Sequence, residues 1–307
     1  SGAGRHCCLI GTGRIVIGDE VRFSPNTTPD PLTLTRLLDE AVRRGIDTVV
    51  MEVSSQALAM HRVDGLLFDL AVLTNLKQLP RPVFTYGRDS VNFRIQPIAE
   101  TLDSITLNLN GHHVEAPLAG AFNMWNLTAA MACGFALDLP WTAMLEFAHH
   151  AALPEGRMEI VCRQPVLVVV DYAHTASALE AMLKHWRKVA DGRHTHLSVV
   201  FGCGGDRETE KRPLMGRIAC TYADQVVLCD DNPRTEDPDR ILAQVAAGCD
   251  GSQKIIRDRA EAIKFVLDGA QTDDIIVVAG KGGETSQIQD TAKTCPNDRM
   301  LITRYFG

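Results

Sequence analysis

The chain has 307 residues, which is enough for two domains that each bury a hydrophobic core. Hydrophobic residues make up 45% and charged residues 22%, the formal net charge is −7, and no run of Lys or Arg stands out. This composition is typical of a soluble globular protein and argues against nucleic acid as the main partner. No apolar run approaches the length of a membrane span, so we expect no membrane association.

The nine cysteines are scattered, and no Cys-x-x-Cys pair occurs among them. This pattern favours reduced, mostly buried thiols over a disulfide framework or a zinc site. No signal peptide opens the chain. We therefore expect a cytoplasmic protein, and we expect it to be a monomer.

The first half of the chain begins with a clear helix signal. Asp30 is an N-cap candidate, Pro31 follows at the first helical position, and Gly45 ends the apolar spacing. Ile46–Val53 then reads as a buried strand and Leu70–Thr74 as another. Alternation of strands and helices predicts a parallel sheet with helices on its faces.

A hairpin follows between Ile105 and Leu118, where two short apolar runs flank Asn110-Gly111. The segment from Trp125 to Leu137 is rich in Ala and Met and reads as a helix. The composition of Ala151–Gly156 indicates a linker.

After this linker, strands and helices alternate more regularly. The predicted strands are Val166–Val170, Leu197–Phe201, Gln225–Cys229 and Ile275–Val278. The predicted helices are Ala176–Ala190, Pro238–Ala247 and Arg259–Leu267. In the first of these helices an apolar face comes from Leu179, Met182, Leu183, Trp186 and Val189.

Each of these four strands runs into a polar or glycine-rich loop. The loops are Asp171–Thr175, Gly202–Arg207, Asp230–Arg234 and Gly280–Glu284. Because the carboxyl ends of parallel strands share one edge of a sheet, we expect their polar side chains to converge. Two Arg and several carboxylates suit a zwitterionic ligand, since Arg grips a carboxylate and a carboxylate holds an ammonium.

Simpler interpretations stand beside this one. Any single loop could be an ordinary turn. His174 could be a hydrogen-bonded structural histidine, and Lys281 a solvated surface lysine.

The same loops, in the same order, resemble the C-terminal domain of the Mur ligase family. Further segments resemble that family's motifs: Asn26-Thr27-Thr28-Pro29, Met51–Leu58, Phe122-Asn123-Met124-Trp125-Asn126, Gly156-Arg157-Met158-Glu159 and Asp298–Gly307. The resemblance covers nearly the whole chain. It implies an α/β fold with two parts: an incomplete central domain at residues 1–153, whose parallel sheet carries a hairpin region, and a Rossmann-like C-terminal domain at residues 154–307.

The resemblance also implies an ATP-dependent amide ligase of peptidoglycan precursor synthesis, with ATP and Mg²⁺ as cofactors. Such enzymes convert a substrate carboxylate to an acyl phosphate, which an amine then attacks. The small-molecule partners implied are UDP-MurNAc-L-Ala-D-Glu and meso-diaminopimelate. Diaminopimelate is favoured over lysine because Arg234, in Asp231-Asn232-Pro233-Arg234, offers a fork for its distal carboxylate.

Carried over position by position, the family's site residues form four sets in this chain. The UDP-substrate set is Asn26, Thr27, Thr28, Ser54 and Arg62, and the metal ligand is Glu52. The nucleotide set is Asn126, Arg157, Asp171 and His174. The set for the incoming amino acid is Arg207, Asp231, Asn232, Arg234, Gly280 and Glu284. Glu52 could instead end a strand, and Ser54 and Ser55 could cap the next helix.

The family pattern is incomplete in this sequence. No Gly-x-x-x-x-Gly-Lys-[Ser/Thr] loop occurs, and Gly11-Thr12-Gly13-Arg14 lacks the Lys and hydroxyl of such a loop. Several dozen family residues, including a lysine that is carbamylated, are missing between Leu76 and Tyr86. The catalytic residues are therefore unknown. A degenerate non-catalytic binding or scaffold protein, a fragment, and part of a longer protein all stay open as alternatives.

Overall fold

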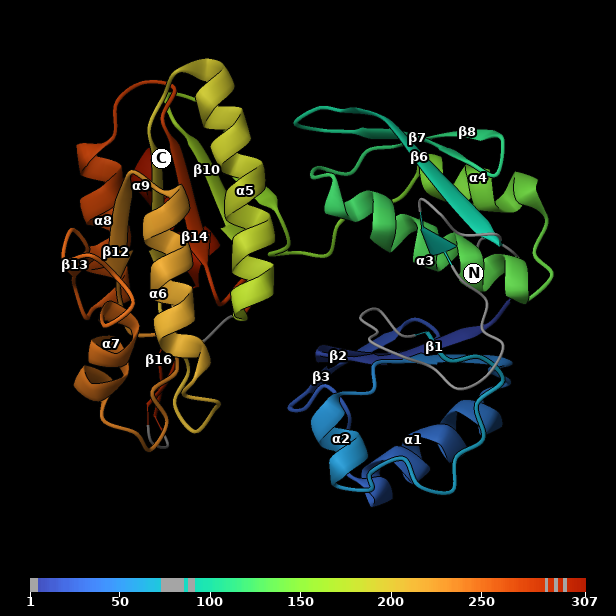
Figure 1. Cartoon of the computed structure of the whole chain (residues 1–307). Helices are drawn as coiled ribbons and strands as arrows, with labels where there is room; N and C mark the ends of the chain where they lie inside the picture. The colour runs from blue at the N-terminus through green and yellow to red at the C-terminus, as the bar shows by residue number, and fades with distance from the viewer. Residues whose placement is uncertain (1–4, 73–85, 88–91, 285–286, 290–291, 295–296) are drawn as a thin grey trace. The chain divides into compact units, whose positions relative to one another are not determined.

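The computed structural model of the chain (Figure 1) describes residues 5–72, 86–87, 92–284, 287–289, 292–294 and 297–307. The chain forms two compact units. Unit 1 comprises Ser1–Pro97, Leu107–Glu115 and Trp125–His150, and unit 2 comprises Ile98–Thr106, Ala116–Met124 and Ala151–Gly307. The simpler domain division at residues 153 and 154 stays a prediction.

Unit 1 opens with a four-stranded sheet in the order β3-β2-β1-β4. Its strands are β1 (Cys7–Gly11), β2 (Gly13–Ile17), β3 (Glu20–Ser24) and β4 (Thr48–Met51). The first three form an antiparallel meander that we did not predict, and β4 runs parallel to β1. The segment Gly11–Arg14 is the tight β1–β2 connection, with Gly13 at φ +79°, and so does not open a helix as a phosphate loop would.

Helix α1 (Pro31–Arg43) confirms the predicted capping: the Asp30 carboxylate accepts from the backbone N–H groups of Leu32 and Thr33. It buries Leu34, Leu37 and Ala41 against the sheet.

Two predicted strands of this region differ from the structure. Ile46–Val53 shortens to β4, and that strand is not buried, because Val49 and Val50 are exposed and its described hydrogen-bonding neighbour is β1 alone. No strand covers the described residues Leu70–Val72, and the rest of the predicted strand lies outside the described residues.

A second sheet, in the order β5-β6-β7-β8, contains the predicted hairpin. Its strands are β5 (Tyr86–Gly87), β6 (Phe93–Glu100), β7 (Ile105–Leu109) and β8 (His112–Ala116). Asn110 and Gly111 have φ of +51° and +88°, as a two-residue hairpin turn with two left-handed positions requires. Three helices of the first half remain: α2 (Ser55–Ala59), α3 (Phe122–Ala136) and α4 (Trp141–His149). Helix α3 begins three residues before the predicted start.

Unit 2 contains a six-stranded sheet in the order β13-β12-β11-β14-β10-β9. All its neighbouring strands run parallel except β9, which pairs antiparallel with β10. The strands are β9 (Glu159–Cys162), β10 (Leu167–Asp171), β11 (Leu197–Phe201), β12 (Gln225–Leu228), β13 (Lys254–Ile255) and β14 (Ile275–Ala279). The central four confirm the predicted strands to within one residue at each end. A short pair, β15 (Gln287–Gln289) and β16 (Ala292–Thr294), follows β14.

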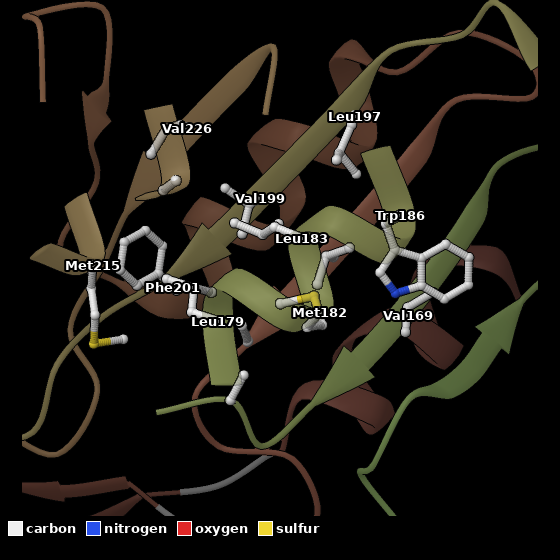
Figure 2. Packing of buried hydrophobic residues seen from close by; sticks show 14 of the residues in the cluster. Val169, Leu179, Met182, Leu183, Trp186, Leu197, Val199, Phe201, Met215 and Val226 are labelled. Carbon is white, nitrogen blue, oxygen red and sulfur yellow. The ribbon is translucent and has the colours of Figure 1, made fainter. Parts of the chain in front are cut away.

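Helices cover both faces of this sheet (Figure 1). They are α5 (Ala176–Arg193), α6 (Lys211–Tyr222), α7 (Pro238–Ala246), α8 (Arg259–Gly269) and α9 (Asp298–Phe306), of which α6 and α9 were not predicted. Alternate residues of each strand face opposite cores: Val169 and Val199 pack with α5, while Val168 and Val200 pack with α8. Figure 2 shows the first core, in which Leu183 and Trp186 of α5 lie over the strands.

The structure thereby confirms the α/β fold with a Rossmann-like second half. None of the helices in the described part of the chain is long and apolar enough to span a bilayer. The eight cysteines that lie within the described residues are free thiols.

Candidate functional site

The carboxyl ends of β10, β11, β12 and β14 lie along one edge of the unit 2 sheet, and glycines bring their loops into contact. A Cβ at Gly202 would lie 2.1 Å from the carbonyl oxygen of Cys229, and a Cβ at Gly205 would lie 1.8 Å from that of Pro233. No side chain fits at either distance. The loops after β11 and β12 are therefore packed backbone against backbone.

Four polar residues at this edge form what we call the acceptor cluster: Asp231, Asn232, Lys281 and Glu284. The Lys281 ammonium donates to Glu284 Oε2 at 3.0 Å and to Asn232 Oδ1 at 3.2 Å, and lies 3.9 Å from Asp231 Oδ1. Asn232 Nδ2 donates to the same Glu284 oxygen at 2.9 Å. Because the Lys281 side chain is only 3% exposed, its interpretation as a solvated surface lysine was wrong.

Within this cluster the Asp231 carboxylate is buried. Burial raises its pKa, while the charges of Lys281 and Arg259 act in the opposite direction. Arg259 is itself neutralised, since its guanidinium lies 2.7 Å from the buried carboxylate of Asp298. The acceptor cluster thus holds two carboxylates and one ammonium, a formal charge of −1.

The Arg234 guanidinium lies beside the acceptor cluster, whereas that of the exposed Arg207 donates to the carbonyl oxygen of Asp206 at 3.0 Å. Arg234 Nη1 donates to the carbonyl oxygens of Gly205, at 2.8 Å, and Asn232, at 3.3 Å. Its Nε and Nη2 have no protein acceptor among the described residues, and its backbone is left-handed, with φ +54°. A Cβ at Gly204 would lie 2.8 Å from Arg234 Nη1 and 3.8 Å from Cγ of Arg207, so glycine leaves room for both side chains.

A buried arginine that we did not predict supports these loops. Arg212 of α6 is fully buried, and donates to both carboxylate oxygens of Glu236, to Gln244 Oε1 and to the carbonyl oxygen of Gly204. Glu236 also accepts from the backbone N–H of Asp206. One guanidinium therefore connects α6 and α7 to the loops that carry Arg207 and Arg234.

The nucleotide set is divided between the units. In unit 2, the Asp171 carboxylate accepts from the backbone N–H groups of Met158 and Ala173 at 2.8 and 2.7 Å, and burial raises its pKa. The Arg157 guanidinium lies 4.4 Å from the ring centroid of Tyr172, a cation–π contact. Asn126 lies on α3 in unit 1.

Tyr172 and His174 lie in the loop between β10 and α5. Burial, together with the nearby Glu284 charge, raises the pKa of Tyr172 to about 12, so its hydroxyl stays protonated at neutral pH. The His174 ring nitrogen Nδ1 lies 2.9 Å from the carbonyl oxygen of Tyr172, and burial lowers the pKa of the imidazole. His174 is thus hydrogen-bonded within its own loop, and its contact with a nucleotide stays a prediction.

The structure brings most of the UDP-substrate set together with Glu52 in unit 1. Glu52 Oε2 accepts from the hydroxyl of Thr12 at 2.6 Å, and that hydroxyl lies 2.9 Å from the Thr27 hydroxyl. The buried Thr28 hydroxyl donates to the backbone carbonyl of Glu52 and accepts from the backbone N–H of Ser54.

Two further members of this set flank the same strand end. Arg62 Nη1 donates to the carbonyl oxygen of Thr28 at 2.8 Å. Ser54 Oγ accepts from Ala57 N–H and so caps α2, as the simpler interpretation predicted. Asn26 is exposed, and its backbone carbonyl oxygen accepts a hydrogen bond from the Ser24 hydroxyl. Thr12 was missed, because its contact with Glu52 depends on the unpredicted β1–β2 turn.

The donor set around Glu52 is compatible with Mg²⁺ but does not form a complete site. No group of three or more His, Cys, Asp or Glu that could hold a metal occurs in the described ranges. Mg²⁺ commonly takes only one or two protein carboxylates and completes its shell with water and phosphate oxygens. Glu52 with the Thr12 and Thr27 hydroxyls fits that pattern.

Two models of protein-family domains match this chain. The model of the Mur ligase middle domain matches residues 5–79, and that of the Mur ligase glutamate ligase domain matches residues 156–282. The UDP-N-acetylmuramoyl-L-alanyl-D-glutamate–2,6-diaminopimelate ligase of Geobacillus kaustophilus is 35% identical over 93% of this chain and 70% of its own length. The chain belongs to the Mur ligase family.

Other Mur ligases extend the comparison. The protein of the same name from Synechococcus elongatus is 37% identical over 89% of this chain and 65% of its own length. A solved structure with that name superimposes with a TM-score of 0.55 at 30% identity, covering 99% of this chain and 74% of the other. The UDP-N-acetylmuramate–alanine ligase of Thermotoga maritima, at 18% identity and a TM-score of 0.52, shares the fold.

The alignment with the Geobacillus Mur ligase also bears on the missing segment. It extends over 348 positions, more than the 307 residues of this chain, so the aligned relative has residues with no counterpart here. This agrees with the predicted loss of family residues between Leu76 and Tyr86. In this chain, residues 76–85 lie outside the described residues.

Proposed function

We propose that the strand-end edge of unit 2 binds meso-diaminopimelate as the incoming amino acid of a peptidoglycan precursor ligase. One observation carries the proposal: an acceptor cluster of charge −1 lies beside Arg234, whose Nε and Nη2 have no protein acceptor among the described residues. The relatives that are at least 30% identical bear the name of a diaminopimelate ligase.

The chemistry of the ligand matches these two groups. One end of diaminopimelate is a zwitterion, whose ammonium suits the acceptor cluster and whose carboxylate suits the fork of Arg234, with Arg207 alongside. Gly280, at φ +107°, lets the backbone pass close to Asp231: a Cβ there would lie 3.3 Å from Asp231 Oδ2. Lysine carries an ammonium at the same end but lacks the carboxylate, so it would leave Arg234 without its partner.

The other substrates are assigned to the remaining sets. UDP-MurNAc-L-Ala-D-Glu would contact Thr27, Thr28, Ser54 and Arg62, with Asn26 beside them. Within unit 2, ATP would contact the Arg157–Tyr172 pair, while Asp171 holds the backbone that presents Arg157. The contact of Asn126 in unit 1 with a nucleotide stays a prediction. Mg²⁺ held by Glu52 would neutralise phosphate charge while the amine of the incoming amino acid attacks the activated carboxylate.

Isothermal calorimetry with the purified chain tests the amino-acid assignment. We expect diaminopimelate to bind more tightly than lysine by roughly 10- to 150-fold, because a hydrogen-bonded charged pair contributes roughly 1.5–3 kcal/mol. Arg234→Ala should remove most of this preference by weakening diaminopimelate binding. Arg304→Ala, which removes an exposed arginine of α9, is the matched control and should change neither affinity. Equal affinities in the unmutated protein would overturn the assignment.

A non-catalytic, amino-acid-binding Mur ligase relative is the second candidate. The observation that supports it is the missing segment after Leu76. It predicts the same calorimetric preference without ligation. Product formation from UDP-MurNAc-L-Ala-D-Glu, ATP and diaminopimelate distinguishes the two.

A further inference from the structure

Lys281 is the residue of the acceptor cluster that neither the carried-over motif nor the proposed chemistry uses. It follows β14 within Gly280-Lys281-Gly282, and its side chain turns inward instead of reaching solvent. Burial of an ammonium is strongly unfavourable unless carboxylates or other acceptors surround it. Here Glu284 and Asn232 accept hydrogen bonds from the Lys281 ammonium, and Asp231 Oδ1 lies 3.9 Å from its nitrogen.

Its charge determines the balance of the cluster. Without Lys281, the buried carboxylate of Asp231 and the part-buried carboxylate of Glu284 would have no cation of their own in the cluster, since the nearby Arg259 is paired with Asp298. With Lys281 present, one negative charge is left over. That negative charge balances the positive charge of one ammonium group.

We propose that Lys281 is a positioning residue that leaves the amino-acid site with enough negative charge for one ammonium group of the ligand. It cancels one carboxylate and orients Asn232 and Glu284, and the remaining negative charge receives the ammonium of the ligand. The inference rests on the proposed function, because it assumes that an amino acid binds at this edge.

A charge-restoring pair of substitutions tests the inference. Glu284→Gln alone brings the formal charge of the cluster to zero, and Lys281→Gln alone brings it to −2. The double variant returns it to −1 with neutral side chains at both positions. Lys264→Gln, which breaks an exposed ion pair with Asp268 on α8, is the matched control.

Binding is measured by calorimetry with diaminopimelate. We expect Glu284→Gln to weaken binding at least 30-fold, and the double variant to recover to within about fivefold of the unmutated protein. A lysine needed only for folding gives the opposite order, with the double variant binding more weakly than Glu284→Gln. That order would overturn the inference. So would a Glu284→Gln variant that binds diaminopimelate as tightly as the unmutated protein.

Thermal unfolding without ligand gives a second readout. Lys281→Gln should lower the melting temperature, and adding Glu284→Gln should raise it again, since the repulsion between the two carboxylates is removed. A double variant that melts below Lys281→Gln would also overturn the inference.

These readouts separate the inference from the proposed function. If the unmutated protein binds lysine and diaminopimelate equally, the diaminopimelate assignment fails, and the same rescue is then measured with lysine, whose side-chain ammonium would take the same place. If it binds neither amino acid, both proposals fail.

Discussion

Gly156 shows how a single residue positions the linker against the site. A Cβ at this residue would lie 1.9 Å from the backbone nitrogen of Gly283, and its φ is +70°. The Gly156 N–H donates to Glu159, and Met158 N–H donates to Asp171. The motif Gly156–Glu159 is therefore packed against the loop that carries Lys281 and Glu284, and does not form a free connection.

Substituting this glycine should destabilise the protein. We expect Gly156→Ala to lower the free energy of unfolding in urea by at least about 2 kcal/mol, because left-handed strain of about 1–2 kcal/mol adds to overpacking of about 1–3 kcal/mol. Gly192→Ala is the control: Gly192 lies in α5 with no atom within 4 Å of an added Cβ. That variant should be stabilised by up to about 1 kcal/mol. Equal midpoints for the two variants would contradict the packing.

At the scale of elements, α6 and α7 are joined through Arg212 and Glu236. The Arg212 guanidinium lowers the pKa of Glu236 from its ordinary 4.5 to about 2. The pKa of this carboxyl is thus depressed in the folded protein. Its contribution to stability is complete above pH 4.5 and is lost as the pH falls toward 2.

This linkage predicts a difference between variants in acid. Glu236→Gln should be less stable than the unmutated protein at pH 6. This difference in the free energy of unfolding should narrow between pH 4.5 and 2, because protonation of Glu236 in the unmutated protein removes the same charge. Chemical unfolding at several pH values measures the difference. Glu208→Gln removes an exposed carboxylate of the preceding loop that makes no ion pair among the described residues, and should show no such narrowing. A gap that is constant with pH would contradict the role of the Arg212–Glu236 pair.

At the scale of the whole molecule, these 307 residues contain more of the groups proposed to bind the incoming amino acid than of those that would handle phosphate. The acceptor cluster, Arg234 and Arg212 are all present and connected. Of the family's phosphate and metal groups, Glu52 is the clear remnant in the sequence. Transfer of a phosphoryl group requires its charge to be neutralised and the reacting groups to be held in line, which in P-loop enzymes the backbone N–H groups, lysine and hydroxyl of that loop do.

We therefore expect the purified 307-residue chain to release no phosphate from ATP with UDP-MurNAc-L-Ala-D-Glu and diaminopimelate supplied. Contacts to adenosine would bind substrate and transition state equally, and such uniform binding does not accelerate chemistry. A coupled phosphate assay measures turnover, and mass spectrometry confirms the 33.6 kDa chain. A complete Mur ligase assayed in parallel is the positive control. Ligation at a rate normal for enzymes, in a preparation free of host ligase, would contradict the prediction.

The sequence by itself determined the four central strands and three of the helices of the second half. Apolar runs of four or five residues and caps such as Thr175 and Asp258 are local signals, so β10, β11, β12 and β14 and helices α5, α7 and α8 could be predicted from them. It also determined that the strand-end loops meet, because the carboxyl ends of parallel strands share an edge.

Only the tertiary structure decided the environment of the charges. Lys281 has the same sequence signal whether it is solvated or buried, and the distant Asp231, Asn232 and β14 loop decide between the two. Arg212 likewise reads as a surface residue of a weakly amphipathic helix until Glu236 and Gln244 surround it. Burial depends on which segments pack together, and that is a non-local property which periodicity along the chain does not contain.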